Sequence, residues 1–251
     1  MKVNIYFRHT DISRATINGR PDWFSHEACF RNLISTIERS KFNSNVIFNF
    51  IFDGNPDILD SEPLYKLFKN SLLCNKKIHV INGGDQRKAW RACIDIVSSD
   101  IRNMESSDLI YLLENDYVHL HNWLDELNSL NNSLINWDVI SLYDHPDKYH
   151  EYCEHIDAEK NKNPKSCVYF TGTHHWKLAP STCATYIMRA DMFDKLKTIL
   201  SMGIYDYKLF FILTKILRRK LISPIPSLST HSMASLLAPA IDWSSVISGK
   251  E

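Results

Sequence analysis

The first 142 residues alternate between short apolar runs and longer segments in which apolar positions recur every three to four residues. The short runs predict strands at residues 2–7, 45–52, 78–81, 109–113 and 138–142. The segments between them have the spacing of amphipathic helices that cover a core. The run Leu109–Leu113 is continuously apolar, which indicates a strand buried on both faces. Strand and helix in alternation predict an α/β fold with right-handed crossovers and a mostly parallel sheet.

Capping signals place the helices. Ser25 is a candidate N-cap for a helix that ends near Ser40, and Asp85 for one that ends near Val97. Other helical patterns cover 57–73, 123–134, 191–200 and 205–219. Beyond Leu142 the pattern predicts short strands at 167–170 and 183–188, an extended segment at 224–230, and a mobile loop or lid at 150–166. We therefore expect a single domain, 1–251, with halves at 1–142 and 143–251.

Polar side chains follow four of the predicted strands. They are Arg8, Asp53, the turn Asn82–Gly84 and the acidic motif Glu114–Asp116. Because the carboxyl ends of parallel strands share one edge of a sheet, where open α/β sheets bind ligands, these residues predict a site. Helix N-termini at this edge favour a phosphate-bearing ligand, and carboxylates suit a hard divalent cation that shares its ligands with phosphate. The local alternative is that Asp116 caps the following helix or is solvated.

Composition narrows the function classes. Lys+Arg and Asp+Glu are 29 each, so a formal charge of +0 gives no electrostatic case for nucleic-acid binding. No apolar run approaches the ~18 residues of a membrane span, and the N-terminus lacks a signal-peptide pattern. The six cysteines include no C-x-x-C pair, which favours free thiols in a reducing compartment. A cytoplasmic protein is expected, which leaves room for peripheral membrane association.

The order of these motifs resembles a GT-A-fold, nucleotide-sugar-dependent glycosyltransferase, family-2-like, of the kind found in bacterial polysaccharide clusters. The resemblance covers roughly residues 1–231. It rests on the first strand, on Asp53, on the glycine turn with Arg87, on the motif Glu114–Asp116, and on the later Asp206 and His231. Two positions depart from the family pattern: the metal motif begins with Glu rather than Asp, and Tyr205 replaces the first residue of a Glu-Asp pair.

The resemblance assigns roles to residues of both halves. It implies Asp206 as the catalytic base, with Asp144 as a competitor, and Asp116 with His231 as ligands of Mn²⁺ or Mg²⁺. The nucleotide would be bound by Arg8, His9, Thr10, Asp53, Asn82, Gly83, Gly84, Arg87 and Asn115. The sugar and the acceptor would contact Glu114, Tyr143, His145, His175, Trp176, Ser181 and Thr182.

The expected function is transfer of a sugar, of hexosyltransferase type, from a nucleotide-sugar donor to a glycan or lipid-linked saccharide acceptor. The resemblance implies an inverting, metal-assisted reaction in cell-surface polysaccharide synthesis. The alternative is a non-catalytic carbohydrate- or nucleotide-binding protein on the same fold. A Rossmann dehydrogenase or methyltransferase is disfavoured, because the segment Arg8–Arg14 lacks the glycines that such a first turn needs.

Overall fold

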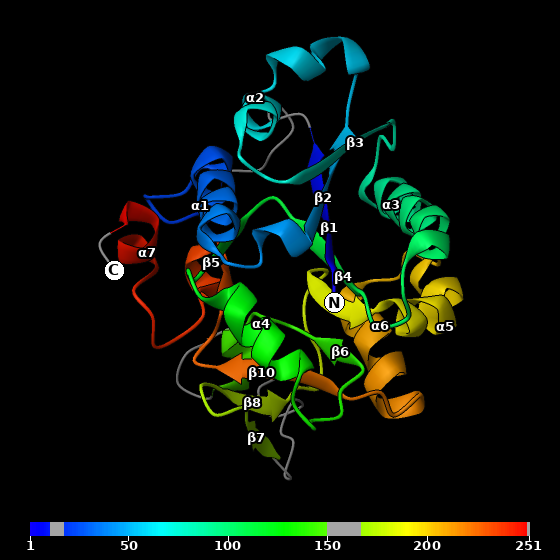
Figure 1. Cartoon of the computed structure of the whole chain (residues 1–251), viewed down its shortest axis with the longest axis vertical. Coiled ribbons are helices and arrows are strands. Elements are labelled where there is room, and N and C mark those ends of the chain that lie inside the picture. Colours follow the sequence, from blue (N-terminus) through cyan, green and yellow to red (C-terminus); the bar gives the residue numbers. More distant parts are fainter. Residues whose placement is uncertain (11–17, 150–166, 250–251) are drawn as a thin grey trace.

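The computed structural model describes residues 1–10, 18–149 and 167–249. Its centre is a nine-stranded sheet with the order β3-β2-β1-β4-β9-β6-β10-β8-β7, and β5 and β11 form a separate pair (Figure 1). The strands are β1 Val3–Thr10, β2 Val46–Asp53, β3 Asn75–Ile81, β4 Leu109–Glu114, β5 Tyr117–His119, β6 Val139–Ile140, β7 Val168–Phe170, β8 His175–Leu178, β9 Tyr186–Arg189, β10 Leu221–Ile225 and β11 Ser229–His231.

The sheet has the predicted directions. β1 pairs in parallel with both β2 and β4, and β2 pairs in parallel with β3. β9 is antiparallel to both of its neighbours, β4 and β6, while β10 is parallel to β6. β8 is antiparallel to β10 and to β7. Within the sheet only β9 and β8 therefore run against the other strands, and the mostly parallel α/β fold is confirmed.

Seven α-helices are described. They are α1 His26–Arg39, α2 Pro63–Asn70, α3 Gln86–Asp100, α4 Trp123–Asn131, α5 Ala190–Leu200, α6 Asp206–Phe211 and α7 Trp243–Ser248. 3-10 turns occupy Asn43–Asn45, Pro56–Ser61, Ile101–Asn103, Pro146–Lys148 and Ala234–Leu236, and α6 continues as a π-helical segment, Ile212–Ile216. Both predicted caps are present: the side chain of Ser25 accepts from the Ala28 N–H, and that of Asp85 from the Lys88 N–H. None of the described helices is long and apolar enough to cross a bilayer.

The helices cover the two faces of the sheet and bury a core on each. Residues from α1, α2, α4 and α7 share one core, and residues from α3, α5 and α6 share the other. Figure 1 shows α1 and α7 on one side of the central strands and α3, α5 and α6 on the other. Along β1, Ile5 and Phe7 enter the first core while Tyr6 enters the second. This alternation is why a continuous apolar run forms a central strand.

Two local predictions differ from the structure, and one pairing was not predicted. The single helix predicted at 57–73 is divided, because Pro63 lacks the N–H for a continuous helix and keeps Glu62 in an extended conformation. The helix predicted at 205–219 leaves α-geometry after Phe211. The pairing of β5 with β11 has no periodic signal, because both strands are only three residues long. The lid predicted at 150–166 lies outside the described residues.

Candidate active site

The strand order creates a switch point between β1 and β4. From β1 the chain proceeds outward to β2 and β3, and it then returns to β4 on the opposite side of β1. In open α/β sheets ligands bind in the crevice at the carboxyl ends of such strands. The register aligns Arg8 with Glu114 across this point, and Thr10 with Asp53 on the other side of β1. The polar strand ends therefore meet, as the sequence predicted.

A cavity of about 310 Å³ opens at these strand ends, and we name it the switch-point cavity. Its apolar lining comes from β2, β3 and α3, with Ile51, Ile81 and Ala89. The predicted site residues that line it are Arg8, His9, Thr10, Asp53, Gly84, Glu114, Asn115 and Asp116. A cavity on which several polar groups converge beside an apolar wall is a candidate small-molecule site.

A second cavity of about 380 Å³ adjoins the first, and we name it the Asp206 cavity. It lies between the start of α3 and the start of α6, and it is lined by Arg8, Asp85, Gln86, Arg87, Trp90, Ala184, Tyr186, Gly203, Ile204, Tyr205, Asp206 and Leu209. Arg8, Asp85 and Gln86 border both cavities. Of these three, Arg8 comes from the central strand β1, whereas Asp85 and Gln86 lie at the start of α3. Arg8 is therefore a border between the switch-point cavity and the Asp206 cavity on the side of the sheet.

Arg8 is held by a carboxylate and by an aromatic ring. Its Nη2 lies 3.1 Å from Oε1 of Glu114, and its guanidinium lies 4.8 Å from the ring centroid of Trp90 on α3. Burial raises the pKa of Glu114 although Arg8 opposes the shift, and the charges of Asp116 and Asp206 raise it further. Glu114 is thus close enough to the other two carboxylates to be repelled by both, and Arg8 is the cation that offsets its charge.

The carboxylate of Asp116 contacts two basic side chains, Arg20 and His231. Its Oδ2 lies 2.8 Å from Nη2 of Arg20 and 3.0 Å from Nε2 of His231. Arg20 also donates from Nη1 to the carbonyl of Ser232 at 2.9 Å. Burial acts to raise the pKa of Asp116, but the hydrogen bonds and charges of His231 and Arg20 outweigh it and lower the pKa to about 2. Asp116 is therefore ionised at neutral pH.

The donor atoms around Asp116 suit a cation that is shared with a diphosphate. Oδ1 of Asp116 is buried and has no hydrogen-bond partner among the described residues. A Mg²⁺-type ion needs one or two protein ligands when phosphates and waters complete its shell. No cluster of three or more His, Cys, Asp or Glu that could hold a metal occurs in 1–10, 18–149 and 167–249, so such an ion would depend on phosphate and water for most of its ligands.

His9 and Asn115 form a buried network at the base of the switch-point cavity. Nδ2 of Asn115 lies 2.9 Å from Nδ1 of His9, and Nε2 of His9 lies 3.2 Å from Oε2 of Glu62. If the amide donates to Nδ1, then the proton of His9 is on Nε2 and is donated to Glu62. These contacts fix the positions of the strand ends, so His9 and Asn115 border the cavity with side chains that already have partners.

The glycine turn after β3 closes the side of the cavity near Asp53. The Gly83 N–H donates to Oδ1 of Asp53 at 2.7 Å, and a Cβ on Gly83 would lie 2.7 Å from the backbone nitrogen of Ala89. Gly84 has φ +71°, which favours glycine. Asn82 is exposed and borders neither cavity. Arg87 lines the Asp206 cavity, where its Nε donates to the Gly203 carbonyl at 3.0 Å.

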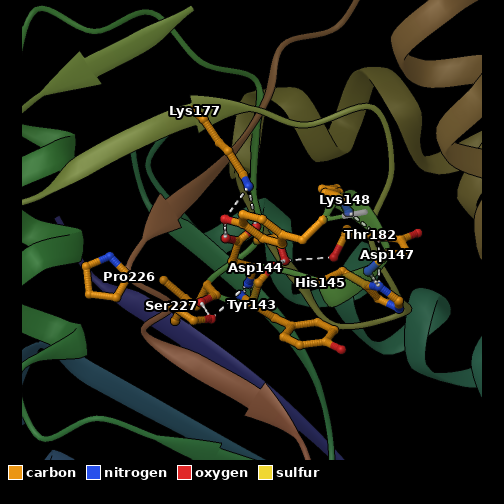
Figure 2. Close-up of polar contacts among 12 residues, drawn as sticks. Tyr143, Asp144, His145, Asp147, Lys148, Lys177, Thr182, Pro226 and Ser227 are labelled. Carbon is orange, nitrogen blue, oxygen red and sulfur yellow. Dashed lines mark hydrogen bonds and ion pairs between the residues drawn. The ribbon is translucent and has the colours of Figure 1, made fainter. Parts of the chain in front are cut away.

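A second group of predicted residues lies in the C-terminal half, and we name it the Asp144 cluster. Lys177 extends from β8 toward Asp144 (Figure 2), and its Nζ lies 2.8 Å from Oδ1. The Tyr149 hydroxyl donates to Oδ2 of Asp144, and Nζ also donates to that hydroxyl at 2.9 Å. The Asp144 N–H donates to Oγ of Ser227 at 2.8 Å. Asp144 is 2% exposed and borders neither cavity, so the structure does not bring it to the proposed site, and its role as a competing base stays a prediction.

Three neighbours of Asp144 are also held by internal contacts. The hydroxyl of Tyr143 donates to a backbone carbonyl, and Nδ1 of His145 lies 2.8 Å from Oδ1 of Asp147. The hydroxyl of Thr182 lies 2.7 Å from that of Ser141. None of the three borders the switch-point or the Asp206 cavity. The structure therefore does not bring them to these two cavities, and their role as sugar or acceptor contacts stays a prediction.

The predicted sugar contacts on β8 are also displaced from the site. Trp176 is fully buried in the first core, because successive side chains of a strand point to opposite faces, and its expected stacking on a sugar is wrong. His175 is exposed, with its ring 4.9 Å from that of Phe170. β8 is four strands from β4, a separation of about 19 Å. Ser181 is half-buried and borders neither cavity.

Sequence reasoning missed several residues of the site. Trp90 lies one turn after Arg87 on α3, and this spacing is a signal that could have indicated a shared face. Gln86 and Tyr186 also line the Asp206 cavity. Arg20 has no local signal, because its partner Asp116 is 96 residues away in the sequence.

No protein-family model matches this sequence, and no curated protein matches it. Among solved structures, mouse xyloside xylosyltransferase 1 is similar at 10% identity over 88% of this chain and 84% of that chain, with a TM-score of 0.45. A putative nucleotide-diphospho-sugar transferase from Desulfovibrio desulfuricans is similar at 12% identity over 89% and 80%, with a TM-score of 0.46. CMP:2-keto-3-deoxy-manno-octonic acid synthetase in complex with CTP is similar at 11% identity over 89% of both chains, with a TM-score of 0.48. Likenesses this distant leave the function to be argued from the site itself.

Proposed function

We propose that this chain is a glycosyltransferase that moves a sugar from a nucleotide-sugar donor to a glycan or a lipid-linked saccharide. The supporting observation is that Arg8, Asp53 and Asp116 border one cavity, while Arg8 also borders a second cavity that contains Asp206. The nucleoside would occupy the switch-point cavity, with Asp53 near the ribose or the base. The diphosphate would lie at Arg8, and the sugar and the acceptor hydroxyl would meet in the Asp206 cavity.

The proposed reaction inverts the anomeric centre. Asp206 accepts the proton of the acceptor hydroxyl, and the oxygen of the acceptor bonds to the anomeric carbon on the face opposite the diphosphate. The bond between that carbon and the diphosphate oxygen breaks, and Arg8 stabilises the charge that develops on the leaving group. A divalent cation held by Asp116 and His231 would supply Lewis-acid stabilisation of the same diphosphate. The pathway in polysaccharide synthesis and the cytoplasmic location remain predictions.

Calorimetry with UDP-, GDP- and CDP-linked sugars, with and without Mn²⁺ or Mg²⁺, tests donor binding. We expect at least one donor to bind, and Arg8→Ala to weaken it by roughly 100-fold because a charge-assisted contact to phosphate is lost. Asp53→Asn is expected to weaken it about tenfold. The exposed residues Arg39 and Asp57 provide matched controls, Arg39→Ala and Asp57→Asn, which should bind as the native chain does. The absence of binding to every donor would overturn the proposal.

A second candidate is a non-catalytic carbohydrate- or nucleotide-binding protein. One observation favours it: Asp116 and Glu114 are already paired with Arg20, His231 and Arg8, so the charges of the site are satisfied without a ligand. Slow hydrolysis of the donor separates the two functions. An enzyme hydrolyses the donor in the native chain and loses this activity in Asp116→Ala, whereas a binding protein shows no hydrolysis in either.

A further inference from the structure

α6 and the segment that follows it expose large apolar side chains on their outer surface. Tyr207 is 63% exposed, Phe211 58% and Ile216 61%. On the inner side of the same helix Leu209 and Phe210 are buried in the second core. Residues four apart lie on one face of a helix, so Tyr207 and Phe211 project together from the covering layer that contains α3 and α5 (Figure 1).

The same segment carries a cluster of positive charge. Between Asp206 and Asp242 the sequence has no Asp or Glu, and its five basic residues all fall within 208–220: Lys208, Lys215, Arg218, Arg219 and Lys220. All but Arg219 are exposed. The chain as a whole has a formal charge of +0, so this concentration is local. We name residues 207–220 the α6 surface.

Most of these cations lack an acidic partner among the described residues, unlike several exposed lysines of other elements. Elsewhere Lys69, Lys88 and Lys195 lie within 3.4 Å of a carboxylate on their own or an adjacent element. On the α6 surface, Arg219 approaches Asp138 at 3.9 Å, and the described residues offer no ion pair to the other four. Cations left unpaired beside exposed aromatic rings complement an anionic surface with an apolar layer beneath it.

We propose that the α6 surface docks this protein peripherally on an anionic phospholipid bilayer. Tyr207, Phe211 and Ile216 enter the headgroup boundary, while the basic side chains contact phosphate groups. A second protein is the less favoured occupant, because the cores of protein interfaces are depleted in charged residues, whereas here charged and apolar side chains intermix. Docking does not require the proposed function. It does place Tyr205 and Asp206, which border the Asp206 cavity, next to the lipid, where a lipid-linked acceptor would be found.

Vesicle sedimentation of the full chain tests the proposal. The chain should bind vesicles of phosphatidylglycerol and phosphatidylethanolamine, should bind pure phosphatidylcholine weakly, and should be released by salt. The triple variant Lys208→Glu, Lys215→Glu, Lys220→Glu should weaken binding by about 100-fold or more. Its matched control reverses the exposed lysines of the opposite side, Lys41→Glu, Lys66→Glu, Lys69→Glu, and should bind as the native chain does.

An apolar pair of variants examines the aromatic contribution. Tyr207→Ser with Phe211→Ser should weaken binding by at least about tenfold, because two interfacial rings are removed. The control Leu72→Ser with Leu134→Ser changes two exposed leucines elsewhere and should have no effect. Equal binding to both kinds of vesicle would overturn the proposal. The proposal would also be overturned if the control variants weakened vesicle binding as much as the α6-surface variants do. A chain that binds no vesicles but self-associates through Phe211, so that Phe211→Ser abolishes the self-association, would overturn it as well. Donor calorimetry on the triple variant shows whether nucleotide-sugar binding is intact when vesicle binding is lost. A failure of the docking proposal is thereby distinguished from a failure of the proposed function.

Discussion

The switch-point residues and the Asp144 cluster contain the same kinds of side chain but are organised differently. In the first, Arg8, Asp116 and Glu114 make ion pairs and still border open cavities. In the second, Asp144 contacts both Lys177 (Figure 2) and Tyr149, and none of the three borders either cavity. Both lie after strands of the same sheet. The difference teaches that polar residues at strand ends indicate a site only where the topology leaves space beside them.

The largest expected effect separates the two carboxylates that competed for the role of base. Asp206→Asn should lower the rate of sugar transfer by roughly 1,000-fold, since a general base is lost. Asp144→Asn should change the rate per folded molecule by less than about threefold. Initial rates with one donor and one acceptor, normalised to the folded fraction by circular dichroism, measure both. A larger loss in Asp144→Asn than in Asp206→Asn would reverse our assignment of the two regions.

A stability experiment tests whether the buried carboxylate of Asp144 depends on its ion pair with Lys177. Lys177→Met leaves a buried carboxylate without its cation and should lower the free energy of unfolding by about 3 kcal/mol. The double variant Lys177→Met, Asp144→Leu should recover most of that loss, because no uncompensated charge remains. Urea unfolding followed by fluorescence gives both values, and donor affinity should be unaffected. If Lys177→Met unfolds as the native chain does, Asp144 has other support or is not buried in solution.

The smallest expected effect is the pH dependence contributed by Asp116. Its pKa in the folded chain is about 2, below the ordinary value of 3.8, so the folded state binds fewer protons than the unfolded one. Its contribution to stability is complete above about pH 4 and is lost as the pH falls toward about 2. Between about pH 5 and pH 3 the native chain should lose about 1 kcal/mol more unfolding free energy than Asp116→Asn. Glu114 acts in the opposite direction, because burial raises its pKa, and comparison with the variant removes the part of its effect that does not depend on the charge of Asp116. Parallel pH profiles of the two chains would contradict the assigned contacts.

The sequence predicted the fold in its strongly periodic parts and failed where long-range contacts decide. Apolar runs gave β1, β2 and β4 to within a few residues, and Ser25 and Asp85 gave two helix starts, because these signals are local. Alternation of strand and helix also gave the shared edge that brings Arg8, Asp53 and Asp116 to one cavity. Their chemical roles remain predictions.

The predicted residues that the structure does not bring to the two cavities have surroundings that come from distant parts of the chain. Trp176 and Thr182 have polar neighbours in the sequence, but the sheet and the loop beside it bury them. Residue type suggested binding for both, whereas burial is determined by what packs above them. Arg20 illustrates the reverse case, since an unremarkable position becomes part of the site through its contact with Asp116.

The pairing of β5 with β11 has a consequence for the order in which the site is assembled. It places His231 beside Asp116 across 115 positions of sequence, and His231 also stacks on Tyr117. Arg20, which precedes Asp116 by 96 residues, contacts the same carboxylate. Closure of such long loops is slow. During synthesis on the ribosome Asp116 emerges before His231, because it lies 115 residues earlier in the chain. The site at Asp116 should therefore remain incomplete until β11 has paired with β5.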